Sequence, residues 1–156
     1  GSTCYQGSRG KLFGAGYEIY IIAFFIGLYF NQRREMNPDS SKRKGFGHPI
    51  QHWGHQENRR GRKSYDKIRE YMFVALVAKS DIDFVELDKG NISKSKAVDT
   101  LIQTMEEYAN YGFFYMEDKL TDNPDYFFRK SAFLDLFLNF LVEESETDDE
   151  ELESLD

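Results

Sequence analysis

Apolar residues dominate one stretch near the start of the chain, residues 17–34, with the sequence YEIYIIAFFIGLYFNQRR. They recur there at helical spacing, and further aromatic and aliphatic residues fill most of the remaining helix surface. Glu18 near the start and Arg33 and Arg34 at the end have the charge order that a helix dipole favours. Because 16 or more residues without a turn signal exceed the usual length of a strand, the pattern predicts one long central helix with neighbours on most sides.

The apolar part of this stretch, residues 19–30, is too short to cross a membrane, since a bilayer core requires about 20 apolar residues in a helix. Basic residues precede it as in a signal peptide, but no small-residue cleavage site follows. We therefore expect no membrane association. Gly1 and Ser2 are typical of a residual tag, and we expect residues 1–16 to form a flexible N-terminus.

Helical spacing of apolar residues returns twice in the second half of the chain. Residues 65–79 show it first, and residues 93–120 repeat it behind Ser93 or Ser95, either of which can cap a helix. Gly112 is a position where this later helix can bend or end. Between the two helices, residues 80–92 fit a short extended segment and an irregular connection equally well.

The sequence Asp122-Asn123-Pro124 predicts the start of a last helix, because a capping side chain precedes a proline at a first-turn position. Apolar residues at helical spacing extend this helix to about Val142. The sequence as a whole predicts a mainly α-helical single domain of four or five helices over residues 17–142. Residues 143–156 form an acidic tail with nine acidic residues and no basic one.

Residues 35–64 lack an apolar period and contain two Pro and four Gly, which predicts a long loop inside the helical domain. The loop lies in the basic half of the chain. Residues 1–63 hold eleven Lys/Arg and four Asp/Glu, a net charge of +7, whereas residues 64–156 hold nine Lys/Arg and 23 Asp/Glu, a net charge of −14. Seven of the basic residues fall within residues 42–63.

This basic loop predicts a phosphate-binding surface. Lys and Arg side chains neutralise phosphates, while exposed aromatic rings can stack on unpaired bases. A surface for an acidic protein partner and a merely solvated loop are the alternatives, since no base-reading motif is present. The residues we expect to contact nucleic acid, DNA rather than RNA, are Lys42, Arg43, Lys44, Phe46, His52, Trp53, Arg59, Arg60, Arg62 and Lys63.

Candidate catalytic chemistry is sparse. His48, His52 and His55 have a spacing that could gather imidazoles around a metal, but nearby glycines and a proline oppose a regular helix there, so we expect no metal site and no cofactor. No phosphate-binding glycine loop, nucleophile elbow or zinc-protease motif is present. We expect no catalytic residues. Cys4, the only cysteine, excludes an internal disulfide and fits a reducing, cytoplasmic location.

Two stretches resemble a family of small helical proteins encoded beside DNA phosphorothioation (Dnd-type) defence systems. The first is an acidic and apolar helix, Glu18 through Gly27 to Arg33-Arg34, followed by the turn His48-Pro49-Ile50. The second is the helix sequence EEYANYG at residues 106–112. The resemblance implies an accessory role in phage defence, alongside a larger defence-system protein, with no catalytic residues. We therefore expect a non-catalytic, nucleic-acid-associated accessory subunit of a bacterial defence or DNA-modification system, with a protein-interaction adaptor as the alternative.

Overall fold

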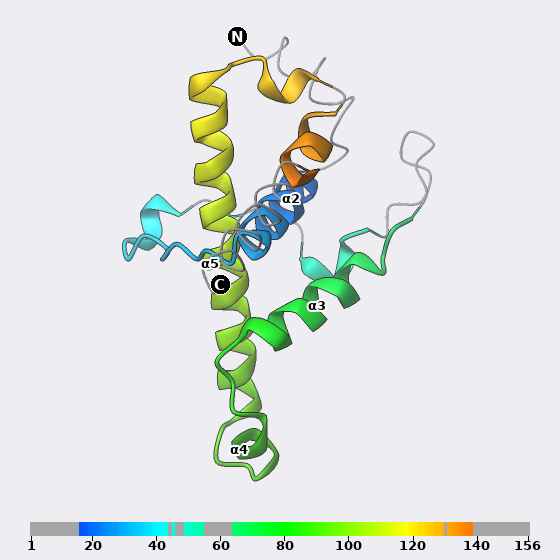
Figure 1. Cartoon of the computed structure of the whole chain (residues 1–156). Helices are drawn as coiled ribbons and strands as arrows, with labels where there is room; N and C mark the ends of the chain where they lie inside the picture. The colour runs from blue at the N-terminus through cyan, green and yellow to red at the C-terminus, as the bar shows by residue number, and fades with distance from the viewer. Residues whose placement is uncertain (1–15, 44, 46–48, 55–63, 130, 139–156) are drawn as a thin grey trace, which may run out of the picture. The chain divides into compact units, whose positions relative to one another are not determined.

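The computed structural model describes residues 16–43, 45, 49–54, 64–129 and 131–138. All regular elements in these ranges are helical, and no β-strand occurs within them (Figure 1), which confirms the mainly α class. The chain divides into two compact units, residues 1–114 and 115–156, with the boundary inside one long helix. We describe each unit separately.

Helix α2, Gly16–Tyr29, is the most buried element of the first unit. Residues on every side of it are buried, and Phe24 and Ile26 are fully enclosed, which confirms the prediction of a surrounded helix. The helix ends earlier than predicted because Asn31 adopts a left-handed conformation with φ of 50°. The Gln32 amide then donates to the Gly27 carbonyl at 3.0 Å, as in a glycine-type helix end with Asn in place of Gly.

Helix α5, Lys94–Asp122, crosses α2 at two glycines (Figure 1). A Cβ atom added to Gly27 would collide with the backbone of Tyr108, and one added to Gly112 would collide with the backbone of Ala23. The two helix backbones therefore touch directly. Of the two alternatives expected at Gly112, a bend or an end of the helix, the end is wrong, because this glycine admits the neighbouring helix while α5 continues through it.

Helices α3, Ile68–Lys79, and α4, Phe84–Asp88, complete the described helices of the first unit. The prediction of a helix within residues 65–79 is confirmed, with Met72 and Leu76 buried. The expectation of an extended or irregular segment over residues 80–92 is wrong for residues 84–88, which form α4, while the residues on either side are irregular. The Asp83 carboxylate caps α4 by accepting the amides of Val85 and Glu86, both at 3.0 Å, and this cap starts a short helix.

The start of α5 follows the predicted capping chemistry, since the Lys96 amide donates to the Ser93 hydroxyl at 3.2 Å. The predicted loop is consistent with the described part of residues 35–64. Its only regular elements there are two short 3-10 turns, η1 at Ser40–Lys42 and η2 at Ile50–His52.

The second unit contains the end of α5, the 3-10 turn η4 at Tyr126–Phe128, and a helical segment at 132–138. The prediction of one uninterrupted helix from Pro124 is wrong. The Asn123 side chain accepts the Asp125 amide at 3.1 Å and forms a turn, and the extended Arg129 ends η4 before the helix begins. Residues 139–142 of the predicted helix lie outside the described residues.

Candidate functional site

The residues on either side of the most basic segment, residues 55–63, are hydrogen-bonded to each other. Residues 55–63 lie outside the described residues, but both flanks are described. The Gly54 carbonyl accepts the Tyr65 amide at 3.1 Å and the Ser64 hydroxyl at 2.9 Å. We call Trp53, Gly54, Ser64 and Tyr65 the loop stem. It holds the ends of a nine-residue connection side by side.

Gly54 is the residue that permits this closure. Its φ of +78° lies in the left-handed region, where L side chains are strained. A Cβ atom at this position would also lie 2.8 Å from the Tyr65 carbonyl carbon, closer than real Cβ atoms approach. The stem therefore requires glycine both for its backbone angle and for the contact across the stem.

Trp53 attaches the loop stem to the core. Its ring stacks on Tyr17 of α2, with centroids 5.5 Å apart and an interplanar angle of 8°, and meets the Tyr20 ring edge-on at 5.4 Å. Only 5% of Trp53 is exposed. The expectation that this ring is exposed for stacking on bases is therefore wrong. Two aromatic side chains of α2, Tyr17 and Tyr20, contact this ring, which the local loop sequence does not reveal.

Polar contacts add a second attachment between the loop stem and α2. The Tyr65 hydroxyl donates to the Glu18 carboxylate at 2.6 Å, and the Gly54 amide donates to the Tyr17 hydroxyl at 3.4 Å. Partial burial, together with the Glu18 hydrogen bond, raises the pKa of the Tyr65 phenol above its ordinary value. Tyr65 therefore keeps its proton and its donor role at neutral pH.

Three other predicted contact residues before the stem, Lys42, Arg43 and His52, are described, and all three are exposed. Lys42 ends η1, where its ammonium lies 3.9 Å from Asp39, and Arg43 donates to the Asn37 carbonyl at 2.7 Å. Both cations thus have local partners and still reach solvent. His52 is exposed at the end of η2. The other predicted contact residues lie outside the described residues: Lys44, Phe46, Arg59, Arg60, Arg62 and Lys63.

Sequence reasoning missed Arg69, which belongs to the same region. Its guanidinium Nη1 donates to the Gln51 carbonyl at 2.6 Å, so the first turn of α3 supports η2 and the segment leading into the stem. The residue lies in the first turn of α3, where a solvated basic side chain is the ordinary expectation. No local pattern in the sequence distinguishes it.

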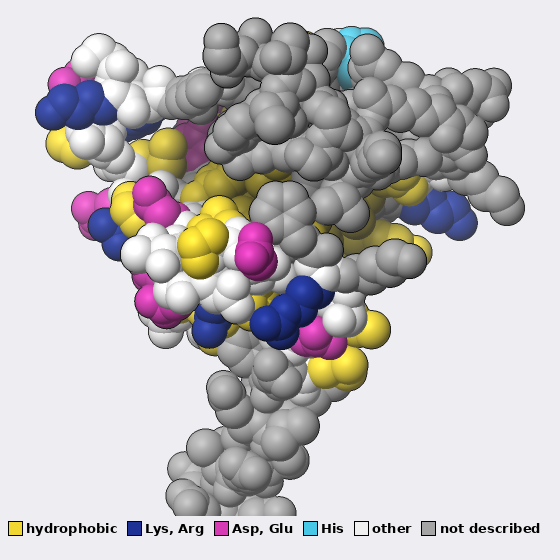
Figure 2. Space-filling view, turned by 90° about the horizontal axis from the view of Figure 1, so that it is seen from above, with side chains coloured by type: hydrophobic (Ala, Val, Ile, Leu, Met, Phe, Trp, Pro, Cys, Tyr) yellow, Lys and Arg dark blue, Asp and Glu magenta, His cyan; other side chains and the backbone are white. Residues whose placement is uncertain are grey.

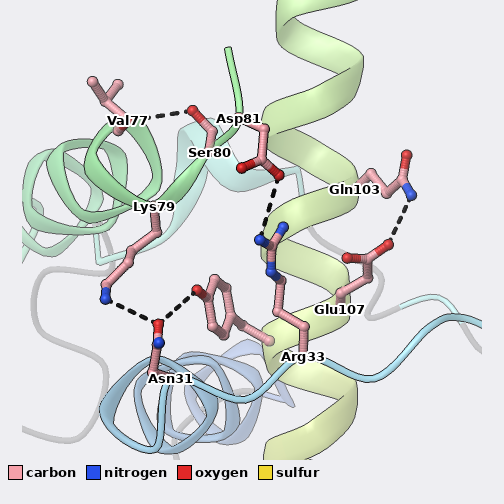
Figure 3. A network of polar contacts seen from close by, with 9 residues as sticks. Asn31, Arg33, Val77, Lys79, Ser80, Asp81, Gln103 and Glu107 are labelled. Atoms are coloured by element: carbon pink, nitrogen blue, oxygen red, sulfur yellow. Dashed lines mark hydrogen bonds and ion pairs between the residues drawn. The ribbon is translucent and has the colours of Figure 1, made fainter.

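A second polar cluster joins the end of α2 to α3 and α5 (Figure 3). The Asn31 side-chain oxygen accepts Lys79 Nζ at 2.9 Å and the Tyr108 hydroxyl at 3.4 Å, while Arg33 pairs with Asp81 at 3.4 Å. These contacts tie three helices together around a helix end. Arg33, one of the two basic residues that follow α2, thus has a structural role in this cluster.

The EEYANYG segment has structural roles in α5. Asn110 donates to the carbonyls of Arg34 and Glu35 at 3.1 and 2.9 Å, and the Glu107 carbonyl accepts the Arg34 amide at 3.1 Å. The Arg34 guanidinium lies 3.6 Å over the Phe114 ring. The segment therefore binds the chain that leaves α2, through the Asn110 side-chain amide and the Glu107 backbone carbonyl.

Within the described ranges, no group of three or more His, Cys, Asp or Glu side chains could hold a metal ion. No helix in those ranges is both long and apolar enough to span a membrane. No family model, no curated protein and no solved structure matches this chain.

Proposed function

We propose that the protein is a non-catalytic, nucleic-acid-associated accessory subunit of a bacterial phage-defence or DNA-modification system. The loop stem is the observation that carries this proposal. Between its two halves, residues 55–63 hold Arg59, Arg60, Arg62 and Lys63 against the single acid Glu57. The residues on either side of this segment, Gly54 before it and Ser64 and Tyr65 after it, are hydrogen-bonded to each other.

Closing the ends of a loop lowers the entropy that binding must remove, since fewer arrangements of the connection remain. Anchoring by Trp53 and Tyr65 makes α2 the fixed support for the stem. A dense group of cations on a fixed support suits the regularly spaced phosphates of a duplex. Contacts of this kind give similar affinity for all DNA sequences, and this affinity falls as the salt concentration rises.

The burial of Trp53 helps to distinguish duplex from single-stranded DNA as the ligand. Single-strand binding relies on aromatic rings that stack on unpaired bases. Trp53 instead stacks on Tyr17 within the core. This supports duplex over single-stranded DNA, and it also favours the second candidate, an adaptor whose basic loop docks an acidic protein surface.

The test compares duplex and single-stranded DNA binding by the purified full chain over a series of salt concentrations. The quadruple variant carries Ala at Arg59, Arg60, Arg62 and Lys63, and the charge-matched control carries Ala at Lys89, Lys94, Lys96 and Lys119. We expect the loop variant to lose affinity for all sequences, with a salt slope lower by about one for each lost phosphate contact. The control should keep the slope of the natural sequence.

Two outcomes would overturn the proposal. Equal losses in both variants would show attraction by overall charge alone, and unchanged affinity in a folded loop variant would remove this loop as the contact. No DNA binding by the natural sequence at low salt would favour the adaptor function. In that case an acidic polypeptide such as polyglutamate should bind, and the loop variant should lose that binding.

A further inference from the structure

Glu18 is an acidic residue that contacts the loop stem. It lies in the first turn of α2 and is half-buried. Acidic and basic side chains lie interspersed on the face shown in Figure 2, so an acid near a basic segment is not unusual in itself. By charge alone, a carboxylate at this place opposes the approach of a phosphate. The contact that Glu18 makes indicates a different role.

The Glu18 carboxylate accepts a hydrogen bond from the stem residue Tyr65, which lies 47 positions away in the sequence. The Tyr65 hydroxyl donates to Glu18 Oε1 at 2.6 Å. This length is typical of an O–H···O⁻ bond, and hydrogen bonds to an ionised acceptor are stronger than those between neutral groups. The contact therefore ties the Tyr65 ring, which is 37% exposed, to α2.

The two flanks of the basic segment are attached to α2 by different means. Before the segment, Trp53 is 5% exposed and stacks on Tyr17. After the segment, the Tyr65 amide donates to the Gly54 carbonyl and the Tyr65 hydroxyl donates to Glu18. The first attachment is part of the core, and the second depends on a polar contact near the surface. Removal of the Glu18 acceptor therefore loosens one flank without removing core packing.

We propose that Glu18 is a positioning residue for phosphate binding by the basic segment, residues 55–63, and that it acts through Tyr65. This inference rests on the proposed function. A flank held on α2 leaves fewer arrangements for the segment to lose on binding, so the affinity for a polyanion rises although Glu18 itself is negative. Charge alone predicts the opposite sign, because removal of an acid strengthens the attraction to phosphate.

Three variants of the full chain separate positioning from charge by their affinity for duplex DNA. Glu18→Ala removes both the acceptor and the charge, and we expect it to bind about fivefold more weakly. Glu18→Gln keeps a side-chain oxygen that can accept from Tyr65, so its affinity should stay within about twofold of the natural sequence. Glu70→Ala, at an exposed acid in the first turn of α3, is the matched control and should bind at least as tightly as the natural sequence.

Tyr65→Phe tests the donor without changing any charge at neutral pH. It should weaken binding as much as Glu18→Ala, and the two losses should not add in the double variant, because both remove the same hydrogen bond. The salt slope should stay the same in these variants, since the cations that contact phosphate are unchanged. Thermal unfolding by circular dichroism establishes that each variant is folded at the temperature of the binding measurement.

Hydrogen exchange of the Tyr65 amide tests the positioning without DNA. This amide donates to the Gly54 carbonyl at 3.1 Å, so its protection shows whether the stem stays closed. Glu18→Ala should speed its exchange by about fivefold or more, and Glu18→Gln should not. Absence of DNA binding by the natural sequence would overturn the proposed function, and with it the role of Glu18 in binding. The exchange rates would still show whether Glu18 holds the stem.

Three results would overturn the inference while leaving the proposed function intact. A Glu18→Ala variant that binds DNA as tightly as Glu70→Ala would show that Glu18 acts only as a charge. Equal losses in Glu18→Ala and Glu18→Gln would show that the carboxylate does not act by accepting the Tyr65 hydroxyl. Unchanged exchange of the Tyr65 amide in Glu18→Ala would show that the stem does not depend on this contact.

Discussion

Helices α2 and α3 are both apolar around most of their circumference, but their surroundings differ. Neighbours enclose α2 on nearly every side, while α3 buries Met72 and Leu76 and leaves Tyr71 and Val74 exposed. The two helices thus share one sequence pattern and have opposite environments. Apolar periodicity therefore identifies a helix, but it does not by itself tell how much of the helix surface the rest of the fold buries.

The largest expected effect separates the two helices directly. Phe24→Ala removes a fully buried ring from α2 and should lower the free energy of unfolding by about 3–5 kcal/mol. Val74→Ala in α3 should change it by less than about 0.5 kcal/mol, because the side chain is 65% exposed. Chemical denaturation measures both. Equal losses of unfolding free energy in the two variants would contradict this difference between α2 and α3.

The α2–α5 crossing should be the next most sensitive point. Gly112→Ala forces the two backbones apart and should destabilise the fold by about 1–3 kcal/mol, although alanine is the better helix former. Gly45→Ala is the control, since nothing lies within 4 Å of an added Cβ there. A stabilised Gly112→Ala variant would show that the crossing can open without cost.

Removal of the α4 cap should have a smaller effect on stability. Asp83→Ala removes the acceptor for the Val85 and Glu86 amides and should cost about 1 kcal/mol. Asp83→Asn keeps a capping oxygen and should recover most of that loss. Thermal unfolding monitored by circular dichroism distinguishes the two variants, and identical melting temperatures would contradict the cap's role.

The smallest effect concerns alkaline pH. The raised pKa of Tyr65 means that the unfolded chain releases this proton first, so Tyr65 contributes stability that is lost as pH rises above about 10. Tyr65→Phe should reduce the loss of unfolding free energy between pH 9 and about 11. Tyr71→Phe, on the exposed side of α3, is the control. An unchanged pH profile for Tyr65→Phe would contradict this contribution.

The sequence predicts the long helices well because their signals are repeated over many residues. The apolar pattern locates α2, α3 and α5, and Ser93 marks the start of α5. The apolar pattern misplaces the end of α2, because the left-handed conformation that ends this helix is confined to one residue, Asn31. It also misses α4, whose five residues depend on one cap at Asp83.

The candidate site is less predictable because its determinants are tertiary. The basic residues of the loop are evident from composition. Gly54 and Tyr65, which pair through their backbones, are more than ten positions apart in the sequence. Trp53 and Tyr17, which stack on each other, are more than thirty positions apart. Local sequence gives Trp53 the appearance of an exposed loop ring, and only the packing of α2 explains its enclosure.

The position of Trp53 also gives the molecule a built-in spectroscopic reporter. It is the single tryptophan of the chain, and it stacks on Tyr17 beside the loop stem. Tryptophan fluorescence of the unmodified protein therefore arises at the stem alone. A shift of the emission to longer wavelength on addition of a ligand would show that this ring becomes hydrated. An unchanged spectrum, when binding is measurable by another method, would show that the stem stays closed.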